Sequence, residues 1–185
     1  MVTRILLACL LLPLVVACNV QTGVYPVENA IQKCSDRDFG FEGTWSASQN
    51  DEVQLDLSLF QLEISRNESY SAMLSDSDGT LKIEYEFRAA ELSKKHPHAI
   101  VEIESKDGSY RRLAIAVADE RQLCLWMIDG RKIGNQLYDD GIAAVIEHFK
   151  FYSSIRCEPE KLIEFIRRNS SKITGSYQIF YRQKN

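Results

Sequence analysis

Few side chains in this chain are grouped in a way that could do chemistry, and each group is incomplete. His96 and His98, separated by one proline, are the only pair spaced for a metal ion, and no third ligand lies near them in the sequence. Residues 76–79, Asp-Ser-Asp-Gly, begin like a calcium loop, but position twelve counted from Asp76 is Phe87, where a bidentate Glu is required. We interpret this segment as a hairpin turn, and we predict no metal site and no cofactor.

Catalytic signatures are also missing from the sequence. It has no Gly-x-Ser-x-Gly, phosphate loop or dinucleotide fingerprint. Several carboxylates alternate with apolar residues, which places them on the polar face of strands and indicates a solvated surface. These carboxylates are Glu84, Glu86, Glu102 and Glu104. If that face turned inward instead, a polar pocket would be lined by Glu84, Glu86, Arg88 and Arg112. We predict no catalytic residues and a protein that is not an enzyme.

Composition describes an ordinary globular chain of 185 residues, with 45% hydrophobic and 26% charged residues. This length predicts a single domain. Lys and Arg number 22 against 26 Asp and Glu, a formal net charge of −4. Without an excess of positive charge to attract phosphate, nucleic acid is not an expected partner.

The N-terminus has the features of a secretory signal. Arg4 precedes an apolar stretch over 5–16, and Val15-Val16-Ala17-Cys18 follows. A helix of that stretch reaches only about 18 Å, too short to cross a hydrocarbon core of about 30 Å. The ending resembles the lipobox of bacterial lipoproteins, which implies that residues 1–17 are removed and that Cys18 is acylated.

Acyl chains on Cys18 would anchor the protein stably in a membrane, since each buried CH₂ contributes about 0.8 kcal/mol. Asn19 follows the cysteine. In the lipoprotein family a residue other than Asp there implies transfer to the outer membrane, so we expect a protein of the bacterial cell envelope that faces the periplasm. The alternative is ordinary secretion after cleavage at Ala17.

The remaining cysteines are Cys34, Cys124 and Cys157, in a compartment where disulfides form. Cys124 lies in the apolar run 122–128, which is typical of a buried free thiol. Cys34 and Cys157 each adjoin charged, loop-like residues, so we predict a disulfide between them. Closing so long a loop would stabilise the fold by roughly 4 to 5 kcal/mol in the chain-entropy model.

Residues 18–33 show little periodicity and suit a tether, so the domain is expected over 34–185. A period of two dominates after Trp45, most clearly where Leu81, Ile83, Tyr85 and Phe87 alternate with charged residues. Short turns between the runs favour up-and-down antiparallel connections. The expected strands are 43–49, 53–66, 69–75, 80–91, 99–105, 109–118 and 121–128.

Within 53–66 the apolar phase changes once, at Leu59 and Phe60, which predicts a β-bulge in a bent strand. After the strands, Asp139 and Asp140 offer N-caps for an amphipathic helix that carries Ile142, Val145, Ile146 and Phe149 on one face.

A second helix is expected from Glu158-Pro159 to near Asn169, with Leu162, Phe165 and Ile166 on one face. A final short strand carries Tyr177, Ile179 and Tyr181, and it would close the sheet by pairing beside the first strand. The predicted fold is mainly β, a small antiparallel up-and-down barrel with two helices and a last strand.

Gly43-Thr44-Trp45, at the start of the first strand, resembles the Gly-x-Trp motif of lipocalins, in which the Trp plugs the closed end of the barrel. The segment from Leu125 to Arg131 resembles the late lipocalin segment whose Arg packs over that Trp. The resemblance implies a lipocalin-like, or more widely calycin-like, barrel in which Arg131 covers Trp45.

In such a barrel we expect Tyr85, Phe87, Leu113 and Trp126 to line the interior, as a filled core or as a ligand pocket. The predicted function is a lipid-anchored envelope lipoprotein that binds a small apolar ligand in the barrel. The alternative is a protein–protein interaction module, such as an assembly accessory, an inhibitor or an immunity factor. It would dock through the helical faces 142–149 and 162–166.

Overall fold

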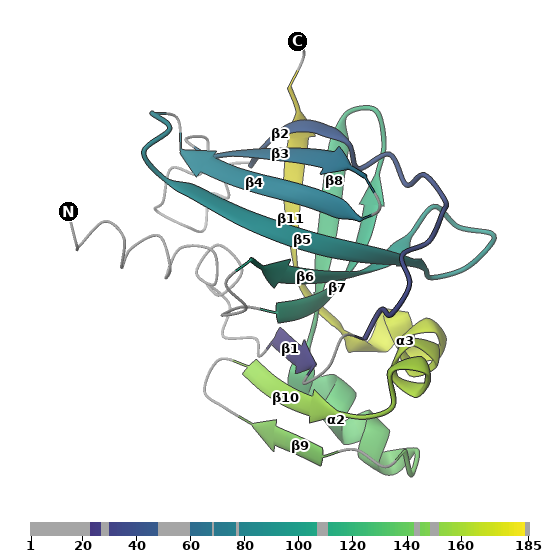
Figure 1. Ribbon diagram of the computed structural model, residues 1–185. Coiled ribbons are helices and arrows are strands. Elements are labelled where there is room, and N and C mark those ends of the chain that lie inside the picture. The colour runs from purple at the N-terminus through teal and green to yellow at the C-terminus, as the bar shows by residue number, and fades with distance from the viewer. Residues whose placement is uncertain are drawn as a thin grey trace.

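The computed structural model describes residues 23–26, 30–47, 60–67, 69–76, 78–106, 111–142, 145–148 and 152–183. Cys18 and the expected signal peptide lie outside these ranges. The elements are β1 (Gly23–Pro26), β2 (Gly43–Ala47), β3 (Phe60–Arg66), β4 (Tyr70–Asp76), β5 (Lys82–Glu91), β6 (Ala99–Ser105), β7 (Arg111–Ala118), β8 (Gln122–Ile128), α2 (Gly130–Asp139), β9 (Val145–His148), β10 (Tyr152–Arg156), α3 (Pro159–Ile173) and β11 (Thr174–Arg182) (Figure 1).

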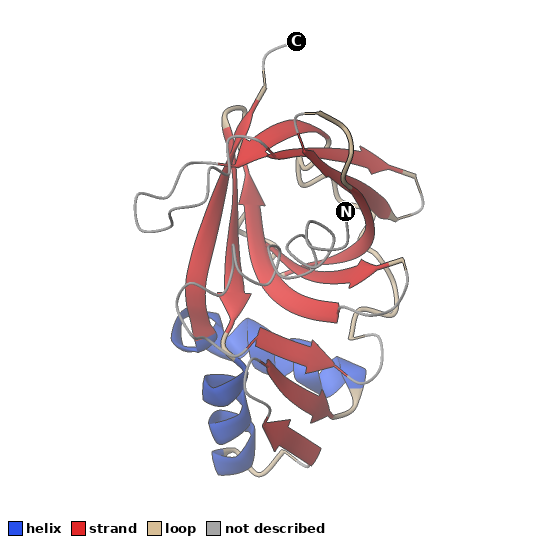
Figure 2. Ribbon diagram, turned by 90° about the vertical axis from the view of Figure 1, so that its left-hand side faces the viewer, coloured by secondary structure: helices blue, strands red, loops and turns tan. Residues whose placement is uncertain are grey.

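Eight of these strands form a closed antiparallel barrel in the order β11, β2, β3, β4, β5, β6, β7, β8 (Figure 2). Strands β2 to β8 pair with their sequence neighbours, which is the predicted up-and-down connectivity. Phe180 of β11 pairs with Ala47 of β2 on one side and with Leu123 of β8 on the other. The last strand therefore closes the barrel and removes both free sheet edges.

The expected strand ranges agree with β2 to β8 to within a few residues where both are described. Turn chemistry explains the agreement: Gly79 has a φ of +68° in the hairpin between β4 and β5, a conformation that L residues rarely adopt. Of the predicted strand 53–66, only Phe60–Arg66 is described. The expected bulge at Leu59 and Phe60 therefore falls at the edge of the described residues, with Leu59 outside them.

The first predicted helix was wrong in position. Helix α2 occupies Gly130–Asp139, and Val145–His148 form strand β9. Asp129 is the N-cap: its carboxylate accepts hydrogen bonds from the backbone N–H groups of Arg131 at 2.9 Å and Lys132 at 3.3 Å. The β-branched pair Val145 and Ile146 is better suited to strand pairing than to a helix.

The second predicted helix and the last strand are confirmed. Helix α3 begins at Pro159 and continues to Ile173, four residues beyond the expected end. Proline is favourable at the first helical position because the N–H it lacks would have no partner within the helix. Leu162, Phe165 and Ile166 lie on its buried face, as expected.

A second layer packs against one side of the barrel (Figure 1). It contains the helices α2 and α3 and a three-stranded sheet in the order β1, β10, β9. Its apolar core, which we call the outer cluster, also includes side chains from β6, β7 and β8 on the barrel. The outer cluster consists of Ala30, Ile31, Ile100, Leu113, Ile128, Ile133, Leu137, Ile155, Leu162, Ile163, Phe165, Ile166 and Ile173.

The segment expected as a tether takes part in this second layer. Residues 23–26 form β1, which pairs in parallel with β10 from Gly23 opposite Tyr152 to Pro26 opposite Ile155. Ala30 and Ile31 are buried in the outer cluster. The folded part of the chain therefore begins before Cys34, the predicted start of the domain. Among the described residues, no helix is long and apolar enough to span a membrane.

Candidate functional site

One end of the barrel is closed around Trp45, which is fully buried. The indole N–H donates to the carbonyl oxygen of Phe41 at 2.9 Å. The guanidinium of Arg182 lies 4.2 Å from the Trp45 ring centroid, within cation–π range. The same guanidinium donates to the carbonyl oxygens of Glu42 at 2.9 Å and Gly40 at 3.0 Å. One arginine therefore fixes the tryptophan and the chain that leads into β2.

The expected arginine–tryptophan pair is present, but the arginine is Arg182 and not Arg131. Arg131 is exposed in the first turn of α2, where its backbone N–H binds Asp129. Arg182 ends β11 and pairs in register with Trp45. The signal available in the sequence was the expected pairing of the last strand with the first, which brings the end of one beside the start of the other.

Gly43 allows Arg182 to approach this closely. Its φ is +137°, a value that L residues rarely adopt, and a Cβ at this position would lie 2.7 Å from Nη1 of Arg182. The glycine and tryptophan of the Gly-x-Trp motif therefore have separate roles. Gly43 leaves room for the guanidinium, and Trp45 provides the surface on which it lies.

Aromatic rings fill the barrel next to Trp45. Phe39 and Phe41 stack with ring centroids 5.5 Å apart, and Phe41 lies 5.4 Å from Tyr70. Tyr70 in turn stacks on Phe87 at 4.9 Å. Burial raises the pKa of Tyr70. We call Phe39, Phe41, Trp45, Tyr70 and Phe87 the aromatic plug.

Beyond the aromatic plug, polar side chains face the barrel interior. The buried apolar residues of the barrel interior form one cluster, which we call the interior cluster: Phe39, Phe41, Trp45, Ile64, Tyr70, Ala72, Leu74, Tyr85, Phe87, Ala89, Ala99, Val101, Ala114, Ala116, Leu123 and Met127. Ser105 pairs with Tyr85 of this cluster, and Arg112 pairs with Ile103, which packs against it. Gln178 pairs with Leu125, which also packs against that cluster. Because paired residues in antiparallel strands share a face, all three polar side chains point inward. Ser105, Arg112 and Gln178 are 6%, 6% and 4% exposed, so they are buried rather than solvated.

The four predicted ligand-binding residues are divided between two sides of the barrel wall. Tyr85 and Phe87 lie in the interior cluster, as expected. Leu113 was placed on the wrong side: it belongs to the outer cluster. Trp126 was also misplaced, since it pairs with Ile115 while its neighbour Met127 pairs with the inward-facing Ala114. Its ring lies 6.0 Å from that of His98.

The reason for this error is that β7 is buried on both faces. Arg112, Ala114 and Ala116 face the interior, whereas Leu113 packs against the second layer. A strand covered on both sides shows no polar face to mark the outside. From the sequence alone, the larger apolar residues of such a strand are therefore assigned to the barrel core, although here they pack against the helices.

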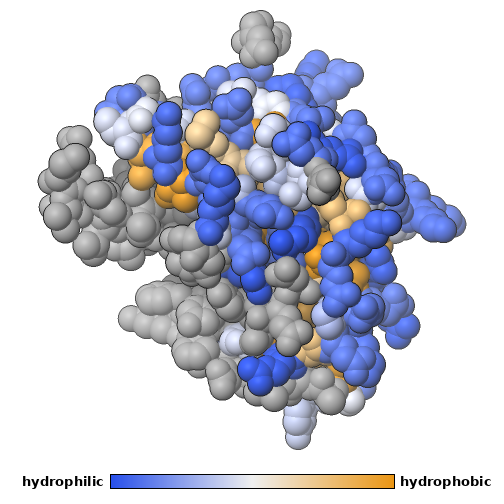
Figure 3. Space-filling model, viewed as in Figure 1, coloured by the Kyte–Doolittle hydropathy of each residue, from blue (hydrophilic) through white to orange (hydrophobic). Residues whose placement is uncertain are grey.

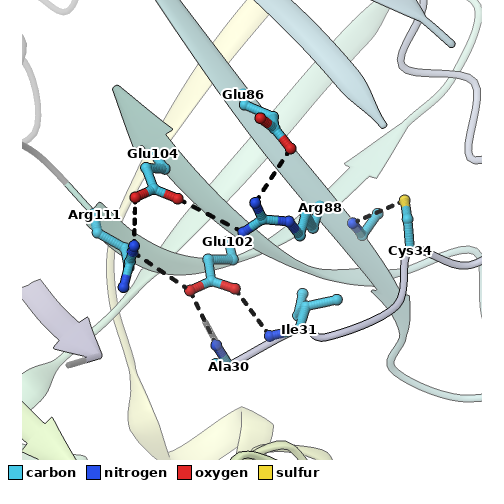
Figure 4. A network of polar contacts seen from close by, with 9 residues as sticks. Ala30, Ile31, Cys34, Glu86, Arg88, Glu102, Glu104 and Arg111 are labelled. Carbon is cyan, nitrogen blue, oxygen red and sulfur yellow. Dashed lines mark hydrogen bonds and ion pairs between the residues drawn. The ribbon is translucent and has the colours of Figure 1, made fainter. Parts of the chain in front are cut away.

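On the outer side of β5, β6 and β7, charged residues form a network (Figure 4). At its centre is Glu102, only 1% exposed, whose two carboxylate oxygens accept hydrogen bonds from the backbone N–H groups of Ala30 at 3.0 Å and Ile31 at 2.9 Å. Arg111 lies 3.9 Å from Glu102 and also pairs with Glu104. Glu102 thus holds the segment 30–31 against the barrel.

This network corrects the expectation of a solvated carboxylate face. Glu84 and Glu86 are partly exposed and pair with Lys106 and Arg88, but Glu102 is buried. Arg88 also bridges to Glu104, 3.6 Å away. The consecutive apolar residues 99–101 were the signal available in the sequence, because a run without alternation indicates a strand covered on both faces.

Burial raises the pKa of Glu102 above its ordinary value of 4.5, although the two N–H groups and then Arg111 and Arg88 oppose the shift. The folded state therefore holds the proton to a higher pH than the unfolded state does. Between the two pKa values it binds more protons, so stability falls as pH rises through this window.

We expect the free energy of unfolding of the natural protein, relative to a Glu102→Gln variant, to decrease as pH rises from about 4.5. The variant cannot titrate at this position, whereas the other carboxylates titrate in both proteins. Urea unfolding followed by tryptophan fluorescence at a series of pH values measures the difference. A difference that increases with pH would contradict the raised pKa.

The predicted Cys34–Cys157 disulfide is not formed: Cys34, Cys124 and Cys157 are free thiols. Cys34 packs against the interior cluster and accepts a hydrogen bond from the N–H of Ala89 at 3.4 Å. Cys157 packs against the outer cluster instead. Their flanking charges resemble each other in sequence, but the two residues belong to different cores. Burial raises the pKa of both Cys124 and Cys157.

His96 and His98 lie with ring centroids 6.2 Å apart. Burial, and then the charge of His96, lower the pKa of His98. Within the described ranges, no group of three or more His, Cys, Asp or Glu side chains is arranged to hold a metal ion.

No protein-family model matches the chain, and no curated protein or solved structure matches it either. The class of protein is therefore defined by the fold: in the described part of the chain, a small antiparallel eight-stranded β-barrel with the helices α2 and α3, consistent with a lipocalin-like barrel.

Proposed function

We propose that this protein is a lipid-anchored envelope lipoprotein that binds a small apolar ligand inside a lipocalin-like barrel. The observation that carries the proposal is that the lining of the barrel interior changes along its length. The aromatic plug closes one end, and buried polar side chains face inward beyond it. A barrel of eight strands is just wide enough for side chains to fill or for one small ligand to enter.

Small residues on one wall support a ligand-binding interior. On β6 and β7, Ala99 pairs with Ala116, and Ala114 pairs with Val101. Ala72 and Ala89 also face inward on β4 and β5. Alanine side chains fill little of the barrel interior. The space left for a ligand therefore depends on the larger side chains opposite these alanines.

The anchor is proposed from the lipobox-like sequence ending at Cys18. Strand β1 begins at Gly23, so the intervening residues span at most about 18 Å. An acylated Cys18 would therefore hold the second layer close to the membrane. We propose the periplasmic face of the outer membrane as the location, because Asn19 follows the cysteine.

Intact mass of the protein extracted from the bacterial envelope tests both parts of the proposal. We expect a chain that begins at Cys18 and carries the mass of two or three acyl chains, and a Cys18→Ala variant that lacks them. Under native conditions we expect a further small-molecule mass that is lost on denaturation. A chain that begins at Cys18 without acyl groups would contradict the anchor, and a native protein without any bound molecule would contradict the ligand.

A second candidate function, docking on a partner protein, is supported by exposed aromatic residues. Tyr177 and Tyr181 on the outer side of β11 are 59% and 47% exposed, and Tyr138 on α2 is 83% exposed. The helical face expected over 142–149 is not formed, because 145–148 form a strand, and on the other expected surface Leu162, Phe165 and Ile166 are buried. Among the described residues on the face in Figure 3, the hydrophobic ones form small, separate areas. A co-purifying polypeptide in the native mass spectrum would favour this function.

A further inference from the structure

We infer that the ligand is an amphiphile whose polar group donates a hydrogen bond, from a hydroxyl or an amide N–H, to the side-chain oxygen of Gln178. This inference rests on the proposed function and deepens it. It assigns the barrel a preference among apolar molecules that its apolar walls alone would not provide.

Gln178 is aimed into the barrel. It pairs with Leu125 of β8, and two residues further on Phe180 pairs with Leu123. Leu123 belongs to the interior cluster, and Leu125 and Phe180 pack against it. The preceding residue, Tyr177, is 59% exposed, as the alternation along a strand requires. Gln178 itself is 4% exposed.

The amide of Gln178 is only half satisfied. Its Nε2 donates to the carbonyl oxygen of Ile179 at 3.2 Å. Its Oε1 is buried and has no hydrogen-bond partner among the described residues. A buried acceptor without a partner destabilises a protein, and a leucine would occupy a similar volume without that penalty. An oxygen held in this way is suited to receive a donor that arrives from outside the chain.

The position of Gln178 also fits a ligand site. Gln178 lies four residues from Arg182, which covers Trp45, and therefore about 13 Å along β11 from the closed end of the barrel. This places the amide beyond the aromatic plug. Leu125 lies opposite and Met127 follows on β8 with its side chain also inward. An apolar chain against these residues, with its polar group at Gln178, describes an amphiphile.

The test uses matched ligands that differ only in the donor. Dodecan-1-ol and 1-methoxyundecane have the same number of heavy atoms, and hexan-1-ol and 1-methoxypentane provide a shorter pair. Each is titrated against the purified protein loaded with 1-anilinonaphthalene-8-sulfonate, and the loss of dye fluorescence is followed. We expect the alcohol of at least one pair to displace the dye at about tenfold lower concentration than its ether, because it alone supplies the missing donor.

Gln178→Leu should abolish this preference by weakening the alcohol to the level of the ether, with ether displacement unchanged. Gln61→Leu, at an exposed position on β3, is the matched control and should keep the preference. Equal displacement by alcohol and ether in the natural protein would mean that a water molecule donates the hydrogen bond to Oε1 of Gln178, and the inference would be overturned. It would also be overturned if Gln178→Leu kept the preference. If no dye or ligand binds at all, the proposed function fails together with the inference.

Discussion

Replacing Gly43 with alanine is expected to lower the unfolding temperature by about 10 °C. The φ of +137° is strained for any L residue, at a cost of about 1 to 3 kcal/mol. The new Cβ would also displace Arg182 from the carbonyl oxygens of Glu42 and Gly40, and hydrogen bonds from a charged group contribute about 1.5 to 3 kcal/mol. For a chain of this size each kcal/mol shifts the transition by about 2 to 4 °C.

Gly79→Ala is the matched control for this experiment. Its φ of +68° also strains an L residue, but nothing lies within 4 Å of the added Cβ. Its effect should therefore be limited to the backbone term of about 1 to 2 kcal/mol. Thermal unfolding followed by circular dichroism measures both variants. Equal losses in the two would show that contact with Arg182 contributes nothing.

A double variant separates the contact from the strain. Arg182→Ala alone should destabilise the protein, since it removes both hydrogen bonds and the guanidinium over Trp45. In Gly43→Ala/Arg182→Ala the added Cβ meets no guanidinium. The combined loss should therefore be smaller than the sum of the two single losses. Additive losses would indicate that Gly43 and Arg182 act independently.

The second large effect is expected from Glu102→Leu, which should destabilise the protein by about 2 to 5 kcal/mol at neutral pH. The substitution leaves the N–H groups of Ala30 and Ile31 buried without their acceptor, and each unpaired donor costs about 1 to 3 kcal/mol. Leucine retains most of the side-chain volume, so cavity formation adds little.

Hydrogen exchange shows where this loss arises. The amides of Ala30 and Ile31 should exchange much faster in Glu102→Leu than in the natural protein, while amides in β3 and β4 of the barrel change less. Glu84→Leu is the control, because Glu84 is half exposed and its ion pair with Lys106 lies at the surface. Unchanged protection at residues 30 and 31 would mean that Glu102 does not hold this segment.

Repeated alternation, turn residues and short connections predicted the barrel and its strand order well, because they are local properties of the chain. Lys82–Glu91 is one example: its inward residues Tyr85 and Phe87 alternate with outward charges, and the structure follows that alternation. Helix α3 was equally accessible, since Pro159 marks its start and Leu162, Phe165 and Ile166 mark its buried face.

The candidate site was only partly predictable, because its residues depend on which side of a strand is covered. Tyr85 was correctly expected inside, whereas Leu113 was assigned to the wrong side. Arg112 was expected inside only if the polar face turned inward, and Gln178 received no role. Glu102 was expected in water and lies under the segment 30–31. The apolar runs 99–101 and 113–118 indicate strands that are covered on both faces, but they do not tell which face is turned to the barrel interior.

The sequence by itself therefore determined the barrel, its consecutive pairing and its closure by the last strand, because period, turn chemistry and hairpin length act over a few residues. Only the tertiary structure decided that Arg182 covers Trp45, that the second layer buries Leu113, and that Glu102 binds Ala30 and Ile31. These contacts join residues far apart in the chain. Their formation depends on how the barrel closes and what packs against it, which no local pattern encodes.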